Sequence, residues 1–404
     1  MKRILCLLCA CLLLTGCGSG TKSDTETKTD LKTVLENAPD ELSHMTEHSP
    51  YENLHFDDPV LHLPQAEGDL YALQIKHDEM RSSQALELFL QTLSHTFQGA
   101  DADKDNIFFG SDSVPPEPND FTLVYPRLYN GTYESEIRND ELDCWLFLYQ
   151  TDTDGAHERD RYFMLGNSGL MKMNRGTCTR SVEKNRALAG WMPRDNFEIA
   201  AWYTPDSEER ISLTNGTCRV CDAAEYCQQY LSSDVFPDQL RSARWMTEAV
   251  GVMNIDNEHQ AYYLSLTREY GGIPFDSLHE EGAYSDFSNG NDYLFDGSEA
   301  LMTSTGEIEY YYLDNTSDQI VPAEQSAAEV LSLKSAAKAV SDTLTKAFAF
   351  DVKQISMVYC NRVISETESE ARAHWCFILY NPNDERTYHV YIDAETGDSF
   401  YYAY

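Results

Sequence analysis

The clearest pattern of hydrophobic and polar positions lies in the last part of the chain, from Leu331 to Tyr404. Apolar residues at helical spacing in LSLKSAAKAVSDTLTKAF predict one helix. Strand-like runs follow near QISMVYC, AHWCFILY and TYHVYIDAETGDSFYY, the last one broken by a turn at DAETG. This order predicts an α+β unit in which a helix covers an antiparallel sheet.

Similar patterns recur upstream. A helix is predicted at SSQALELFLQTLSHTF, and strands at FTLVYPRLY, DCWLFLYQ and RDRYFMLG, where the turn Gly166–Gly169 leads into LMKM as a hairpin. Helical spacing returns at Asp222–Tyr230 and Gln239–Val250. Strands are then expected at AYYLSLTREYGGIPF and SEALMTSTGEIEYYYL, with a turn at Gly306.

The shared order of elements suggests tandem α-β-β-β units, with Gly169, Gly306 and Gly397 in their turns. The expected fold class is therefore α+β, built of helix-covered antiparallel sheets. The expected organisation is a signal peptide at 1–16, an anchor and flexible tether at 17–50, an N-terminal α+β domain at 51–215, a middle α+β unit at 216–325 and a C-terminal domain at 326–404.

The beginning of the chain indicates a location. Lys2 and Arg3 precede an apolar run from Ile4 to Leu14, which is typical of a signal peptide and too short to span a bilayer. The following LTGC resembles the bacterial lipobox, which implies that Cys17 is lipidated. We therefore expect an extracytoplasmic protein held on the cell membrane by a lipid anchor. The alternative is an ordinary secretory signal with an unrelated cysteine.

The charge balance narrows the class of partner. Acidic residues outnumber basic ones 67 to 30, and the formal net charge is −37. Nucleic-acid binding is not expected, because it requires clustered Lys and Arg. Beyond the signal peptide, no segment approaches the length of apolar sequence needed to span a bilayer.

The final turn and its flanking strands carry a family resemblance. The C-terminal region resembles a PepSY domain, whose members commonly end in Tyr-x-Val-x-Ile/Val-Asp-x-x-Thr-Gly; the matching residues are Tyr388, Val390, Ile392, Asp393, Thr396 and Gly397. YGGIP at Tyr270–Pro274, followed by GEIEYYYLDNT, is similar to Gram-positive extracytoplasmic proteins of the YycI and YpeB kind. The resemblance implies modulation of a peptidase or a sensor kinase, with no catalytic residues. A lipid anchor in place of a transmembrane helix departs from the YycI type.

Several short motifs have the spacing of metal sites. Asp101, Asp103, Asp105 and Asp112 match part of an EF-hand calcium loop, but Asn106 stands where the turn glycine belongs and Pro115 follows too soon for the exiting helix. An acidic, solvated loop is the default interpretation. His44-x-x-Glu47-His48 has the H-x-x-E-H spacing of a zinc protease but lies in the expected tether, so we interpret it as a chance match.

The cysteines leave several alternatives open. Cys360 and Cys376 fall on consecutive predicted strands, where they are candidates for a cross-strand disulfide. Cys218, Cys221 and Cys227 form a second cluster, with Cys178 as a further candidate. A structural disulfide is the first hypothesis for this cluster, followed by free thiols, a zinc site and redox catalysis.

No motif identifies a reaction or a cofactor. The first function hypothesis is therefore a non-catalytic binding or regulatory module for a protein partner, such as a peptidase, a sensor or a wall enzyme. One alternative is a receptor for a small molecule or peptide. The other is a hydrolase whose site is assembled from residues on separate strands.

Overall fold

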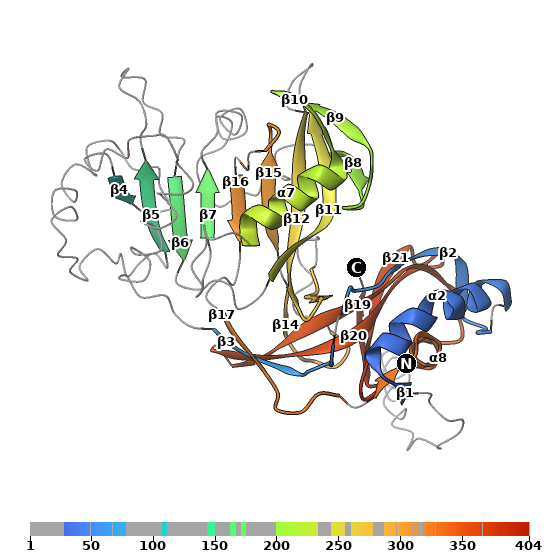
Figure 1. Cartoon of the computed structure of the whole chain (residues 1–404). Coiled ribbons are helices and arrows are strands. Elements are labelled where there is room, and N and C mark those ends of the chain that lie inside the picture. The colour runs from blue at the N-terminus through green and yellow to red at the C-terminus, as the bar shows by residue number, and fades with distance from the viewer. Residues whose placement is uncertain are drawn as a thin grey trace, which may run out of the picture.

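The computed structural model has two large β-sheets and, in its described part, three helices (Figure 1). It describes residues 28–48, 50–66, 68–77, 107–110, 144–149, 162–166, 171–174, 199–232, 244–254, 260–277, 287–295, 297–306, 308, 310–313, 318–327, 329–365 and 367–403. One sheet has ten strands and the other eight. The predicted α+β class is confirmed.

A long hairpin forms the centre of the eight-stranded sheet. Its strands, β19 (Phe350–Ser365) and β20 (Glu368–Asn381), are antiparallel along nearly their whole length. β21 (Arg386–Asp393) continues the sheet beside β20, and β22 (Ser399–Ala403) lies beside β21. These are the strands expected from the C-terminal pattern.

The DAETG turn between β21 and β22 forms as its residues predict. The carboxylate of Asp393 accepts hydrogen bonds from the backbone N–H groups of Glu395 and Thr396, both at 2.8 Å. Gly397 has a φ of 81°, a conformation that glycine adopts without a steric penalty. Asp393 and Gly397 therefore serve the backbone of a turn.

Segments from outside the C-terminal region complete this sheet. β2 (Leu54–His62) pairs in parallel with the first half of β19, and β14 (Tyr293–Leu294) pairs with its second half. β3 (Leu73–His77) pairs with the start of β20, and β17 (Asp318–Pro322) pairs with β3. β2 and β3 lie within the predicted N-terminal domain at 51–215, but they share a sheet with the C-terminal strands.

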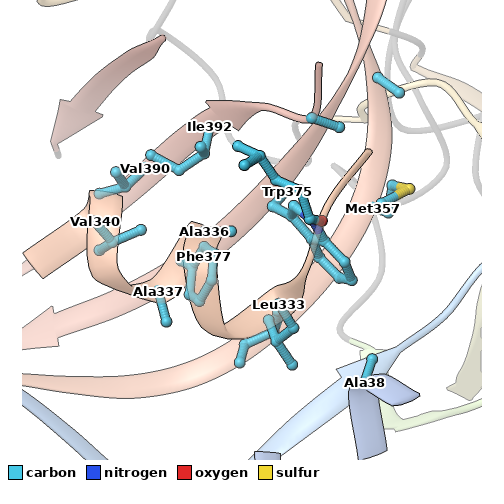
Figure 2. Close-up of a cluster of buried hydrophobic side chains, with 14 of the residues drawn as sticks. Ala38, Leu333, Ala336, Ala337, Val340, Met357, Trp375, Phe377, Val390 and Ile392 are labelled. Carbon is cyan, nitrogen blue, oxygen red and sulfur yellow. The ribbon is translucent and has the colours of Figure 1, made fainter. Parts of the chain in front are cut away.

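Two helices cover one face of the eight-stranded sheet (Figure 1). α8 (Leu333–Thr343) is the predicted C-terminal helix, and the Ser332 hydroxyl caps it by accepting from the N–H of Ser335. In Figure 2, Ala336 and Val340 of α8 lie close to Phe377 and Val390 of the sheet. This packing forms the main hydrophobic core.

α2 (Leu31–His48) packs beside α8. It occupies most of the second half of the region 17–50, for which a flexible tether was expected. Asp30 caps it by accepting from the N–H of Thr33, and a carboxylate oxygen of Glu41 accepts from the N–H of Lys334 on α8. Its buried residues are Leu31, Val34, Ala38 and Met45. The prediction for this part of 17–50 was wrong because the buried face is narrow and its polar flanks dominate the composition.

The ten-stranded sheet is antiparallel and carries α7 (Val220–Ser232) against β11 and β12 (Figure 1). Its strands in spatial order are β4 (Ile107–Gly110), β5 (Cys144–Tyr149), β6 (Tyr162–Gly166), β7 (Met171–Asn174), β16 (Tyr310–Leu313), β15 (Ser298–Met302), β12 (Gln260–Tyr270), β11 (Arg244–Asn254) and β8 (Ile199–Tyr203), with β13 (Ile273–Pro274) beside β12. Two small ribbons pair β1 (Lys28–Thr29) with β18 (Val330–Leu331), and β9 (Arg210–Leu213) with β10 (Gly216–Arg219).

The helix predicted at Gln239–Val250 is wrong over its second half, which is strand β11. The register of β11 shifts between Thr247 and Ala249, where a bulge adds one residue. Trp245 and Thr247 are buried before the bulge, and Val250 and Val252 after it. Because of the bulge, the buried residues Thr247 and Val250 are three positions apart instead of two. A spacing of three is typical of a helix.

The two sheets meet where the β12–β13 hairpin reaches β19. Phe275 forms a parallel bridge with Tyr359, and the N–H of Asp276 donates to the carbonyl of Tyr359 at 2.9 Å. At the tip of the hairpin, Gly271 and Gly272 have φ values of 60° and 85°. A Cβ on Gly272 is placed 2.3 Å from the carbonyl oxygen of Gln65, whereas a Cβ on Gly271 meets nothing within 4 Å.

These neighbouring glycines give a matched pair of variants. Gly271→Ala adds only the left-handed strain and is expected to lower the free energy of unfolding by about 1 kcal/mol. Gly272→Ala adds an overlap with backbone and is expected to cost about 3 kcal/mol. Urea denaturation measures both. An equal loss from the two variants would contradict the close contact at Gln65.

Candidate functional site

Several predicted site residues lie outside the described part of the chain. These are the lipidation candidate Cys17, the calcium candidates Asp101, Asp103, Asp105 and Asp112, and the disulfide candidate Cys178. Lipidation and calcium binding therefore stay predictions. No described helix is long and apolar enough to cross a membrane.

The predicted Cys360–Cys376 disulfide is not formed, and both thiols are free and buried. In the register of the hairpin, Cys360 lies opposite Arg372 and Cys376 lies opposite Ser356. The two cysteines are therefore offset along the strands, although they occupy consecutive ones. Burial raises the pKa of both thiols well above the usual value, so neither is an activated thiolate.

The second cysteine cluster has free thiols at Cys218, Cys221 and Cys227. Burial raises the pKa of Cys218, and it raises the pKa of Cys227 to about 12. Cys227 lies on the buried face of α7, so its role is in packing. The raised pKa values of Cys218 and Cys227 do not favour redox catalysis by these two residues, because it requires a thiolate.

His44, Glu47 and His48 lie near the end of α2. The two imidazole rings stack with their centroids 4.3 Å apart, and a ring nitrogen of His48 lies 3.0 Å from the carbonyl oxygen of His44. Nowhere in the described residues do three or more His, Cys, Asp or Glu side chains gather in a way that could hold a metal ion. The side chains of His44, Glu47 and His48 are exposed to solvent.

One polar cluster brings together residues from three strands of the eight-stranded sheet and one strand of the ten-stranded sheet. His77 is the last residue of β3, with Nδ1 at 2.7 Å from Oδ1 of Asp318 and Nε2 at 3.0 Å from Oγ of Ser369. Arg268 of β12 donates to the other carboxylate oxygen of Asp318 at 2.7 Å. The order Ser–His–Asp is that of a serine hydrolase triad.

Access to this cluster is restricted. The exposed fractions of the Arg268 and Asp318 side chains are 2% and 0%, and that of Ser369 is 3%. The His77 side chain is 18% exposed. A catalytic serine must reach its substrate, and here the hydroxyl is enclosed within the sheet. The carboxylate of Asp318 is also shared with a guanidinium, so the arrangement acts first as a buried ion pair between the sheets.

The sequence could not reveal this cluster. Asp318 and His77 are 241 residues apart, and Ser369 and His77 are 292 residues apart. No short motif surrounds any of the three. Only the pairing of β3 with both β17 and β20 brings them together.

A different kind of site lies at the end of the ten-stranded sheet, on β8. Trp202 is 52% exposed, although its ring packs edge-on against Tyr263 at a centroid distance of 5.8 Å. The ring also lies over Gly251, where an added Cβ is placed 3.3 Å from it. A glycine in the neighbouring strand thus makes room for a large aromatic ring, which is held in place while one side faces solvent.

The buried ion pair leads to a stability prediction. Asp318→Asn leaves the guanidinium of Arg268 buried without its counter-charge and is expected to lower the free energy of unfolding by about 3–5 kcal/mol. The matched surface control is Asp342→Asn, which removes exposed pairs with Lys338 and Lys346. Its expected cost is below about 1 kcal/mol.

A second substitution separates charge from packing. Adding Arg268→Met to Asp318→Asn removes the isolated charge, so part of the lost stability should return in urea denaturation. If the double variant is less stable than Asp318→Asn alone, the ion pair is not the source of the effect.

Comparisons with known proteins show a similar fold but do not assign the chain to a family. No protein-family model matches the sequence. No curated protein matches it either. Among solved structures, it is similar to the crystal structure of an uncharacterized protein from Eubacterium rectale ATCC 33656, with 12% sequence identity and a TM-score of 0.50. The match covers 92% of this chain and 98% of the other, and at this identity it shows a likeness of fold alone.

Proposed function

We propose that this protein is a non-catalytic, extracytoplasmic lipoprotein, anchored to the membrane through Cys17, that binds a protein partner. The lipobox-like LTGC supports the anchor. Ser369, His77 and Asp318 could form a catalytic site, but they hydrogen-bond to one another in a largely enclosed cluster. Restricted access of this kind favours a binding role over a catalytic one.

The proposal includes tandem PepSY-like units. α8 is followed by β19, β20, β21 and β22, which are neighbours in that order. α7 is followed by β11, β12, β15 and β16, which are also neighbours in that order. This shared order supports a repeated unit of one helix and four strands, one strand more than the sequence pattern suggested. In this respect the resemblance to PepSY-containing regulators, which have no catalytic residues, is consistent with a binding role.

The observation that carries the proposal is where apolar side chains are exposed. Five large hydrophobic side chains are exposed in the described chain, and three of them lie on edge strands: Val60 on β2, Trp202 on β8 and Val321 on β17. An edge strand offers unpaired backbone groups, and adjacent apolar side chains offer contact area. Together they suit docking of a partner, through side-chain contact or, where an edge is open, through addition of a strand.

The test is photo-crosslinking in the native membrane. The photoreactive residue p-benzoylphenylalanine is introduced at position 60, 202 or 321, and at the exposed positions Glu36 and Lys346 as controls. We expect a discrete cross-linked protein from at least one edge position and none from the controls, because contact is expected only along the sheet edges.

Two outcomes count against the proposal. Absence of a cross-link at every edge position, or the same products at edge and control positions, would show that no partner docks on these edges. The anchor is examined in the same cells: Cys17→Ser is expected to move the protein from the membrane fraction to the medium, since it removes the acceptor of the lipid.

A hydrolase is the second candidate, because the hydrogen bonds from Ser369 to His77 and from His77 to Asp318 follow the order of a catalytic triad. A fluorophosphonate probe labels an activated serine covalently. Since Ser369 is enclosed, we expect no labelling of this residue by mass spectrometry. Labelling of the native protein that disappears in Ser369→Ala would establish the hydrolase and overturn the non-catalytic role.

A further inference from the structure

The edge strands of the two sheets differ in how they are protected from strand addition. β2 is kinked at Asp58, which has a φ of 51°, and Pro59 follows it. β17 ends at Pro322, which has no N–H to donate. A sheet edge is commonly blocked by proline, charge, bulges or a covering loop. Both of these edges carry such features.

The edge of β22 is covered by another part of the chain. The N–H of Ser288 donates to the carbonyl of Tyr401 at 2.8 Å, and the Ser288 hydroxyl accepts from the N–H of Tyr401 at 2.9 Å. Phe287, next in the chain, packs against Phe400 and Tyr402. The middle of this edge is therefore occupied by the chain itself.

Within the described residues, β8 has none of these protections. Its sequence, IAAWY, contains no proline and no charge. Within the described residues β8 pairs with β11 alone, so its other edge faces away from the sheet. An uncharged edge of this kind is a template for an added strand.

Trp202 gives this edge an anchor point. Because Tyr263 and Gly251 already hold the ring, little side-chain freedom is lost when a partner covers it. Tryptophan is among the residues that contribute most to protein interfaces, and the face of its ring attracts Lys and Arg.

The charge around β8 indicates which partner fits. Asp206, Glu208 and Glu209 follow the strand and are exposed, and in the described part of the chain Glu208 forms an ion pair with Arg219. The chain as a whole has a net charge of −37. A second copy of the chain is therefore repelled, whereas a basic segment is attracted.

We propose that β8 is the docking edge for an extended segment of a protein partner that contains Lys or Arg. The segment adds as a strand beside β8, and one basic side chain lies over Trp202. This inference rests on the proposed binding function and names the chemistry of the partner.

The experiment uses the purified full chain and a short fluorescent peptide of alternating lysine and valine. Fluorescence anisotropy is expected to show saturable binding that weakens as salt rises. The same peptide with glutamate in place of lysine, and a lysine peptide N-methylated along the backbone, are expected not to bind. The second result is expected because methylation removes the N–H groups that pair with an edge.

Variants locate the binding site. Trp202→Ala is expected to weaken binding about tenfold, Trp202→Phe to restore part of it, and Phe348→Ala, an exposed aromatic outside any strand, to change nothing. Asp206→Asn together with Glu209→Gln is expected to weaken binding and reduce its salt dependence. Circular dichroism confirms that each variant is folded.

Each contrary result overturns the inference in a definite way. No binding of the lysine peptide, equal binding of the glutamate peptide, or equal effects of Trp202→Ala and Phe348→Ala removes β8 as a site for basic segments. Such a failure is distinct from failure of the proposed function, because cross-linking at positions 60 or 321 can still reveal a partner on another edge.

Discussion

The backbone ladder between β19 and β20 is the constraint on which the rest of the eight-stranded sheet depends. The hairpin is long enough for each of its strands to have two different neighbours, one at either end. β2 and β14 divide the free side of β19, and β21 and β3 divide the free side of β20. Segments distant in sequence are therefore held in one sheet by pairing with a single local element.

This arrangement also places the buried charges. β3 pairs with both β20 and β17, so His77 is brought between Asp318 and Ser369. Arg268 then comes from the other sheet to the same carboxylate. Replacing a buried ion pair with hydrophobic residues is often neutral or stabilising, so the pair is not explained by stability alone. The pair also joins the two sheets, because Arg268 lies on β12 and Asp318 lies on β17.

Local patterns predicted the elements whose contacts are local. The C-terminal helix, the strands after it and the DAETG turn were recognised because alternation, capping and turn residues are all within a few positions of one another. The predictions for two elements were wrong, and each error has a physical reason. A bulge between Thr247 and Ala249 changed the spacing of buried residues in β11, and the narrow buried face of α2 was concealed by its charged surface. The cluster around His77 could not be predicted from the sequence, because only the pairing of distant strands brings its residues together.

The same distinction applies to the candidate binding edge. Sequence alone shows that IAAWY is uncharged, but an uncharged strand in the middle of a sheet has no special meaning. What gives β8 its interest is its position at the end of the sheet, next to a glycine that accommodates Trp202. The edges of β2, β17 and β22 carry proline, a kink or a covering serine, and these features hinder strand addition. Within the described residues β8 is an edge without these features, and its preordered tryptophan and acidic surroundings fit the docking of a basic segment that we propose.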